Sequence, residues 1–245
     1  MSESSARKLE VRRAYDSQVL TYEKRRFSGL GGELFDRLEK SHVLHWLKKR
    51  RVLQIGTATG RFTELLPHNG YEYYGIEIAQ EMARFAKVRL GIQGSEVVAE
   101  VIQGDGESLP FDRSCFDDVL SVRSFHFLPR PRVFVREALR ILVPGGRLVV
   151  SFEVLSRMAL LLQNLGVMPR GTPTRTYYTI ESIVRLFREE GLVILWSGKV
   201  TKMPLNGYWK VPRRVIGFIK KFHQSAPDWF GTVGSVIGEK PPERI

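Results

Sequence analysis

Cysteine is nearly absent from this chain of 245 residues, because Cys115 is its only one. A single cysteine excludes an internal disulfide framework. Long hydrophobic runs are also missing: the longest candidate, MALLLQNLGVM, is interrupted by Gln163 and Asn164, whereas a membrane span needs ~18 apolar residues. The N-terminus, MSESSARKLEVRRAYD, is polar and mixed in charge, which argues against a secretory signal. We therefore expect a soluble, cytoplasmic protein.

Histidine is sparse as well, and the five histidines form no metal-binding grouping with Cys115. No metal site is predicted. Internal repeats and low-complexity segments are lacking. Hydrophobic residues make up 43% of the chain and charged residues 26%, a composition typical of a globular protein with a sizeable core.

Charge of one sign dominates what is present. There are 38 Lys and Arg residues against 26 Asp and Glu residues, a net charge of +12. The excess lies mainly toward the two ends of the chain, whereas residues 51–110 are slightly acidic. A basic periphery favours anionic partners such as a phosphorylated substrate, a membrane surface or nucleic acid. A solubilising surface explains the same charge, so both alternatives stay open.

Strand and helix patterns alternate along the chain. Strands are predicted over 51–56, 71–78, 95–105, 116–124, 147–154, 192–200 and 230–240, and helices over 4–26, 33–49, 61–67, 79–90, 131–142 and 179–190. Such alternation with short loops is typical of a parallel sheet with helices on both faces. We expect an α/β fold with an N-terminal helical segment, 1–49, interrupted at 28–32. The main domain, 50–245, would carry insertions at 155–178 and 201–229.

The stretch VLQIGTATGRF, residues 52–62, joins the first strand to its helix through small residues. Ligands of open α/β sheets bind at this turn, and glycine lets the backbone approach them. A dinucleotide loop needs glycine where Arg61 stands, and a phosphate loop needs Gly-Lys-Ser/Thr, so both are disfavoured. Gly56, Ala58 and Gly60 fit a loop with glycine at alternate positions, although that pattern alone also fits a turn that binds nothing.

Two acidic residues follow at the ends of the next two strands. Glu77 lies 21 residues after Gly56, a spacing that suits hydrogen bonds to both ribose hydroxyls of an adenosine-type ligand. Asp105, with Gly106 beside it, follows the third strand and can reach an adenine amino group. Together the three strand ends favour a nucleoside-containing ligand.

Four segments then resemble a known family. VLQIGTATGRF, YYGIEIAQEMARFA, GDGESLPFDRSCFDDVLSVRSFHFL and REALRILVPGGRLVVS are similar to successive motifs of the class I S-adenosylmethionine-dependent methyltransferases. The similar branch is the small-molecule one that includes the quinone-biosynthesis enzymes, and the resemblance spans about residues 50–154. It implies a Rossmann-like, seven-stranded, mostly parallel sheet with an antiparallel last strand and an N-terminal helical lid. It further implies S-adenosylmethionine as cofactor and in-line methyl transfer to a small-molecule acceptor.

The resemblance also assigns residues to the cofactor. It places the methionine part against Gly56, Thr57, Ala58 and Gly60, the ribose against Glu77, the adenine against Ile78, Met82, Asp105 and Gly106, and the sulfonium near Val122 and Arg123.

Two positions depart from the family pattern. Gln54 replaces a carboxylate that usually helps to orient the cofactor's amino group, although its amide oxygen can accept the same hydrogen bond. Ala58 replaces a glycine, and its Cβ fits if the local φ is negative. We expect weaker cofactor binding rather than none.

A catalytic pair is not expected, because the cofactor itself brings the reactive group. His126, after the fourth strand, is the best-placed candidate base, and a histidine that merely packs is an equally good interpretation. Tyr15 and Tyr22 lie two helical turns apart on one face of the lid. They are interpreted either as active-site contacts or as core aromatics.

The segment after the fifth strand falls where the family shapes its acceptor pocket. It carries Arg157, Arg175 and Tyr178, and arginines there suit a carboxylate or phosphate acceptor. Residues 211–224 predict a basic amphipathic helix, which would either touch an anionic membrane or pack on its own domain. The alternatives to a small-molecule enzyme are an RNA-binding methyltransferase and a regulator that binds the cofactor without turnover.

Overall fold

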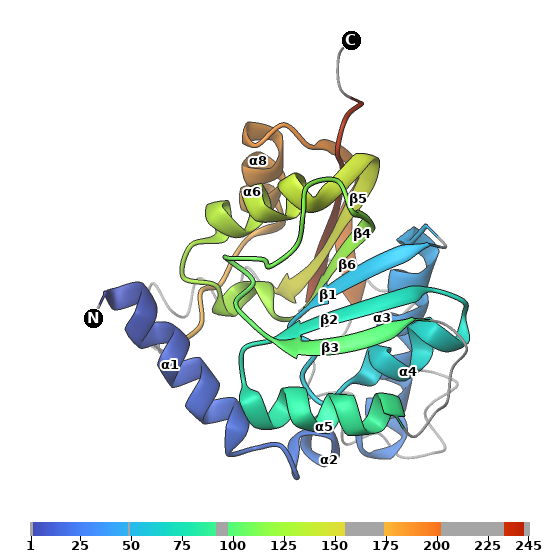
Figure 1. Ribbon diagram of the computed structural model, residues 1–245, viewed down its shortest axis with the longest axis vertical. Coiled ribbons are helices and arrows are strands. Elements are labelled where there is room, and N and C mark those ends of the chain that lie inside the picture. The colour runs from blue at the N-terminus through green and yellow to red at the C-terminus, as the bar shows by residue number, and fades with distance from the viewer. Residues whose placement is uncertain (1, 49, 92–97, 155–173, 202–232, 243–245) are drawn as a thin grey trace.

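The computed structural model describes residues 2–48, 50–91, 98–154, 174–201 and 233–242 (Figure 1). Within these residues the chain forms a seven-stranded sheet in the order β3-β2-β1-β4-β5-β7-β6. The strands are β1 (Arg51–Ile55), β2 (Glu72–Glu77), β3 (Ala99–Gln103), β4 (Phe116–Val122), β5 (Leu142–Glu153), β6 (Val193–Thr201) and β7 (Val233–Glu239). β7 runs antiparallel to both of its neighbours, β5 and β6, and the other neighbouring strands pair in parallel. This is the predicted α/β, Rossmann-like fold.

Helices cover both faces of the sheet (Figure 1). One face packs against α3 (Gly29–Trp46), α4 (Arg61–His68) and α5 (Gln80–Gly91), through a core that includes Val43, Phe62 and Ala86. The other face packs against α6 (Pro131–Ile141) and α8 (Ile180–Glu189), through Phe134 and Phe187 among others. These apolar positions recur at helical spacing, which is why the sequence predicted the helices.

The N-terminal helices differ from the prediction of one helix over 4–26. Instead, α1 (Glu3–Asp16) ends and α2 (Tyr22–Phe27) begins after a short turn. Side chains cause the break: Ser17 Oγ and Gln18 Nε2 both donate hydrogen bonds to the carbonyl of Ala14. The predicted interruption at 28–32 is mostly helical, because α3 begins at Gly29.

In Figure 1, α1 crosses the side of the sheet toward which β2 and β3 point. Two of its contacts with α5 are polar. Asp16 Oδ1 accepts a hydrogen bond from the backbone N–H of Glu81 at the start of α5, and Arg12 donates one to Gln80. Thus α1 and α2 lie at the carboxyl ends of the strands, while α3 belongs to the helical layer on one face.

Candidate functional site

A cavity, partly open to solvent, lies between α1 and the carboxyl ends of the first four strands. Its walls come from the N-terminal helices, from the loop after β1, from the ends of β2 and β4, and from the segments that follow β3 and β4. The lining residues are Lys8, Val11, Tyr15, Tyr22, Ile55, Gly56, Ala58, Ile76, Glu77, Ile78, Gly104, Asp105, Gly106, Val122, Arg123, Ser124, Phe127, Leu128 and Pro129.

The loop after β1 depends on left-handed backbone conformations. Gly56 has φ +79°, and a Cβ added there would lie 2.4 Å from Cβ of Ser124, so the end of β4 can approach only because this residue is glycine. Ala58 also has a positive φ, +47°. The condition under which the Ala58 Cβ fits without strain, a negative φ, is therefore not met, and an alanine in this region carries a strain of about 1 kcal/mol.

Glu77, at the end of β2, anchors this loop from within the cavity wall. One carboxylate oxygen accepts a hydrogen bond from the backbone N–H of Ala58 at 2.8 Å, and the other accepts one from the backbone N–H of Ala79 at 3.0 Å. Burial raises the pKa of Glu77, and these two backbone donors oppose the rise. Each carboxylate oxygen keeps a further lone pair for a ligand hydroxyl.

Asp105 also lines the cavity, and it contacts a residue that the sequence analysis missed. Lys8 Nζ lies 2.6 Å from Asp105 Oδ2 and 2.5 Å from Glu107 Oε2. The Glu107 side chain is fully buried and also pairs with Arg130. Helical spacing could have identified Lys8, because Lys8, Val11 and Tyr15 follow the i, i+3, i+7 pattern of one helix face. All three line the cavity.

Tyr15 and Tyr22 both line the cavity, although they belong to two helices rather than one. Their ring centroids are 5.9 Å apart, and Tyr15 also meets Phe127 edge-on at 5.3 Å. Burial raises the pKa of Tyr15 to about 12, despite the opposing charge of Arg26. The Tyr15 phenol is therefore neutral at physiological pH.

Four predicted cofactor residues lie behind the cavity wall rather than on it: Gln54, Thr57, Gly60 and Met82. The Gln54 side chain is buried, and its amide oxygen accepts a hydrogen bond from the Tyr73 hydroxyl at 2.7 Å. Met82 is fully buried beside Tyr22. These positions shape the wall from behind.

Val122 and Arg123, at the end of β4, complete the wall beside Gly56. Arg123 has φ +50°, and its backbone N–H donates to the carbonyl of Ser151. Its guanidinium, almost fully buried, lies 3.1 Å from Glu39 Oε1. No local pattern in the sequence points to Glu39, which lies on α3.

His126 is buried and does not line the cavity, although its neighbours Phe127 and Leu128 do. Burial holds its pKa well below the usual value, and the nearby charges of Arg175, Arg123, Arg26 and Arg7 lower it further. The imidazole is thus neutral and a weak base. These four arginines make the surroundings of His126 electropositive.

The predicted acceptor residues are placed only in part. Arg175 lies 3.1 Å from Glu153 Oε2, with its guanidinium 5.2 Å from the Phe127 ring centroid. Tyr178 packs on the core against Phe125, away from the cavity wall. Arg157, the rest of the 155–173 segment and the 211–224 helix lie outside the described residues.

The chemistry of this site fits an adenosine-type cofactor. Carboxylates of Glu77 and Asp105 supply acceptors at two strand ends, and Ile55, Ile78 and Leu128 supply apolar surface for a base. Residues 53–150 match the family of methyltransferase domains known as Methyltransf_11. This segment therefore resembles a class I S-adenosylmethionine-dependent methyltransferase domain.

Curated proteins similar to this chain include two from bacteria. The fatty-acid O-methyltransferase of Mycolicibacterium smegmatis is 37% identical over 99 residues, which are 40% of this chain and 35% of that protein. The biotin biosynthesis bifunctional protein BioHC of Cellvibrio japonicus is 32% identical over 148 residues, 59% of this chain and 27% of that protein. The chain thus matches only about a third of the length of either relative.

Similarity to solved structures extends over more of the chain than similarity in sequence does. The [4+2]-cyclase SpnF matches with a TM-score of 0.72 at 20% identity, covering 96% of this chain and 97% of its own. A methyltransferase-type fold therefore also carries a cyclase, so the reaction has to be argued from the site.

Two other site types find no support in the described residues. No group of three or more His, Cys, Asp or Glu side chains there could hold a metal ion. Nor is any helix in that part of the chain long and apolar enough to cross a membrane.

Proposed function

We propose that this protein transfers a methyl group from S-adenosylmethionine to a carboxylate oxygen of a small molecule with an apolar body. The observation that carries the proposal is the group of arginines at the Phe127 end of the cavity. Arg26 lies 4.5 Å from the Tyr22 ring centroid and Arg175 lies 5.2 Å from the Phe127 ring centroid, so both guanidinium groups contact aromatic rings that line the cavity, although neither arginine lines it. Planar guanidinium groups bind carboxylates in two-pronged geometry.

Proton chemistry supports a carboxylate over an alcohol or phenol. An alcohol or phenol must lose a proton as it attacks, which calls for a base with a pKa near the working pH. His126 is a weak base for the reasons given above, and the Tyr15 phenol is too weak an acid to share the task. A carboxylate is already deprotonated near pH 7, so it needs orientation rather than a base.

The apolar walls of the cavity suit the apolar body of the proposed acceptor. Val11, Tyr15, Phe127, Leu128 and Pro129 give the cavity a largely hydrophobic lining at this end. The relative that methylates fatty acids has an acceptor of the same character, a carboxylate on an apolar chain. We therefore favour a lipid-soluble acid as the acceptor.

The proposed roles follow from these placements. When bound in the cavity, S-adenosylmethionine would supply an electrophilic methyl group to the carboxylate oxygen, and its sulfur would keep the electron pair of the broken S–C bond. Glu77 would accept the ribose hydroxyls, and Asp105 the adenine amino group. Arg26 and Arg175 would hold the acceptor, while Tyr15 and Phe127 would exclude water from the reacting atoms.

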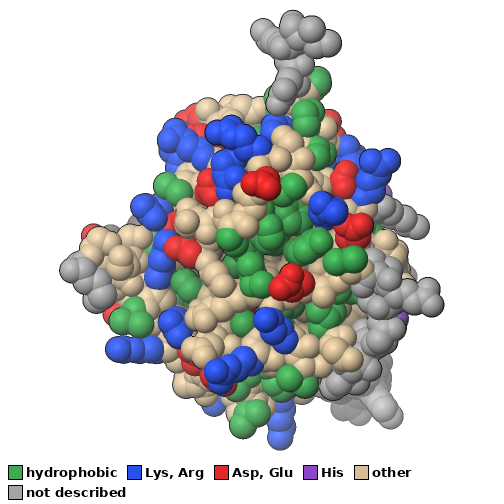
Figure 2. All heavy atoms as spheres, in the orientation of Figure 1, with side chains coloured by type: hydrophobic (Ala, Val, Ile, Leu, Met, Phe, Trp, Pro, Cys, Tyr) green, Lys and Arg blue, Asp and Glu red, His purple; other side chains and the backbone are tan. Residues whose placement is uncertain are grey.

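Other acceptors remain hypotheses with weaker support. A quinone-type phenol would need the base that the described site lacks. RNA would need a continuous basic surface, and Figure 2 shows Lys and Arg scattered among Asp and Glu on the face that it presents. A regulator without turnover would bind the cofactor and methylate nothing.

The test begins with isothermal titration of S-adenosylmethionine, S-adenosylhomocysteine and NAD. We expect micromolar binding of the two sulfur nucleotides and none of NAD. Radiolabelled methyl transfer is then measured with matched acceptors of equal chain length: a fatty acid, its alcohol, and an alkyl phenol. Methylation of the acid alone supports the proposal, and methylation of the alcohol or phenol with the acid inert would overturn it. Cofactor binding without turnover of any acceptor favours a regulator, and salt-dependent RNA binding favours the RNA alternative.

A further inference from the structure

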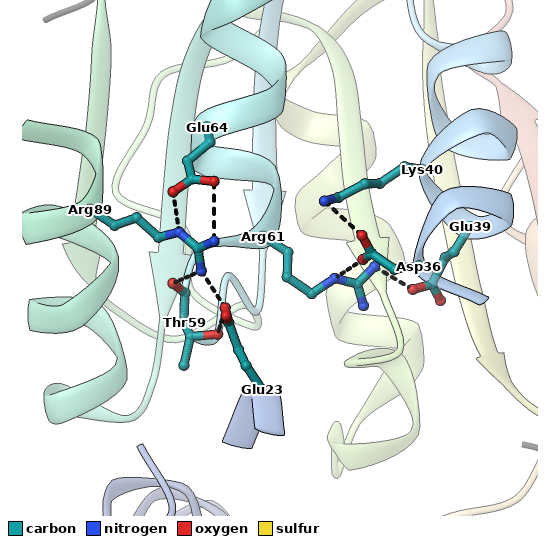
Figure 3. Close-up of polar contacts among 8 residues, drawn as sticks. All are labelled: Glu23, Asp36, Glu39, Lys40, Thr59, Arg61, Glu64 and Arg89. Carbon is teal, nitrogen blue, oxygen red and sulfur yellow. Dashed lines mark hydrogen bonds and ion pairs between the residues drawn. The ribbon is translucent and has the colours of Figure 1, made fainter. Parts of the chain in front are cut away.

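A fully buried carboxylate lies between two guanidinium groups at the back of the cavity. Glu39 Oε2 lies 2.7 Å from Arg61 Nη2, and Glu39 Oε1 lies 3.1 Å from Arg123 Nε. Figure 3 shows Glu39 and Asp36, both on α3, reaching toward Arg61 at the start of α4. Burying a carboxylate is costly unless it is paired, so these contacts explain how Glu39 tolerates its position.

The two arginines differ in the number of carboxylates that pair with them. Arg61 has a second carboxylate, Asp36, at 2.8 Å, and Lys40 shares that carboxylate at 2.8 Å (Figure 3). Among the described residues, Arg123 is within ion-pair distance of Glu39 alone. Glu39 is therefore the group that neutralises Arg123.

Arg123 cannot easily move its charge away. Its backbone is fixed by the hydrogen bond to Ser151, and its guanidinium lies 4.9 Å from the Phe35 ring centroid and 5.3 Å from that of Phe27. Arg123 is nevertheless one of the residues that line the cavity, as Gly56 is. A charge on Arg123 that is not neutralised therefore acts electrostatically on a ligand bound in the cavity.

We infer that Glu39 is a positioning residue that neutralises Arg123, so that the cavity accepts a cationic methyl donor as well as its neutral product. The inference rests on the proposed function. S-adenosylmethionine carries a positive sulfonium, whereas the sulfur of S-adenosylhomocysteine is uncharged. An unpaired Arg123 repels the first and not the second, so Glu39 sets the ratio of the two affinities.

Glu39→Gln tests this with a nearly isosteric side chain that has no charge. We expect the ratio Kd(S-adenosylmethionine)/Kd(S-adenosylhomocysteine), measured by isothermal titration, to rise about tenfold, the scale of one unit charge acting within a low-dielectric cavity. A carboxylate with a merely structural role would weaken both ligands alike and leave the ratio unchanged. The double variant Glu39→Gln/Arg123→Gln should return the ratio to the wild-type value.

Two more variants complete the design. Arg123→Gln alone leaves Glu39 uncompensated on that side, so the ratio should fall below the wild-type value; this arm decides the question if Glu39→Gln does not fold. The matched control is Glu190→Gln, which removes a carboxylate held between Arg132 and Arg136 outside the cavity wall and should leave the ratio unchanged.

The outcomes separate the two proposals. Wild-type binding with a ratio that none of the variants shifts overturns the role of Glu39 and leaves the proposed function standing. Absence of binding of either sulfur nucleotide by the wild-type protein overturns both. A ratio that rises in Glu39→Gln, falls in Arg123→Gln and is restored in the double variant supports the inference.

Discussion

Lys8 Nζ lies 2.6 Å from Asp105 Oδ2, an ion pair that joins the N-terminal helix to the segment after β3. The same ammonium reaches Glu107, whose side chain is fully buried. Because both Lys8 and Asp105 line the cavity, this contact holds α1 in place over the candidate cofactor site.

Lys8→Met should loosen α1 while leaving the rest of the fold intact. The methionine keeps the apolar stem but leaves Asp105 and Glu107 without the ammonium, a loss of about 1–2 kcal/mol of local stability. Hydrogen exchange of the α1 amides is expected to accelerate about tenfold or more, with α6 amides unchanged. Lys24→Met, on the exposed face of α2, serves as the control. Unchanged exchange in α1 would contradict the assigned role of Lys8.

Ala58→Gly should stabilise the protein. Glycine accepts the positive φ of this position without strain, and this gain outweighs its extra unfolded-state entropy by up to about 0.5 kcal/mol. Urea denaturation measures the free energy of unfolding. Ala14→Gly, the same change at an exposed position of α1, should destabilise α1 by about 1 kcal/mol, measured from the exchange of its amides. A destabilised Ala58→Gly protein would show that the Ala58 side chain contributes more packing than strain.

His126 should make the protein less stable in mild acid. Its pKa is lowered in the folded state, so protonation below the unfolded pKa of about 6.5 favours the unfolded chain. His42, with a pKa lowered to about 4 by burial, acts in the same direction, whereas Asp118, with a pKa raised to about 7 by burial, acts in the opposite one. A difference measurement isolates His126: between pH 7 and pH 5.5 the wild type should lose about 1 kcal/mol relative to His126→Gln. Parallel stability curves for the two proteins would refute the burial of a neutral imidazole.

Arg175→Gln should weaken binding of the acceptor and leave binding of the cofactor unchanged. Losing one charged hydrogen-bonding group is expected to raise KM for a carboxylate acceptor by about tenfold to a hundredfold, with the Kd of S-adenosylmethionine unchanged within about twofold. Steady-state kinetics and isothermal titration measure the two quantities. Arg185→Gln, on the exposed face of α8, is the control. If KM does not change, the acceptor carboxylate does not bind at Arg175.

Much of this architecture was predictable, because it is written in local patterns. Alternating apolar strands and amphipathic helices predicted the order of the elements. The positions of Gly56, Glu77 and Asp105 at the ends of predicted strands were also readable from the sequence. All three line one cavity, since parallel strands bring their carboxyl ends to the same edge. Boundaries were less certain: the turn that separates α1 from α2 depends on side-chain hydrogen bonds at Ser17 and Gln18.

Periodicity and short-range spacing were enough to predict the sheet and the acidic residues that face the cavity, and the motifs over about residues 50–154 carried the resemblance to methyltransferases. Only the tertiary structure decided that Lys8 meets Asp105, that Glu39 neutralises Arg123 and that the backbone at Ala58 is left-handed. These contacts join residues far apart in the chain. A charge far along the sequence becomes a partner only when packing brings it within a few ångströms and removes the water between, and no local pattern encodes that distance.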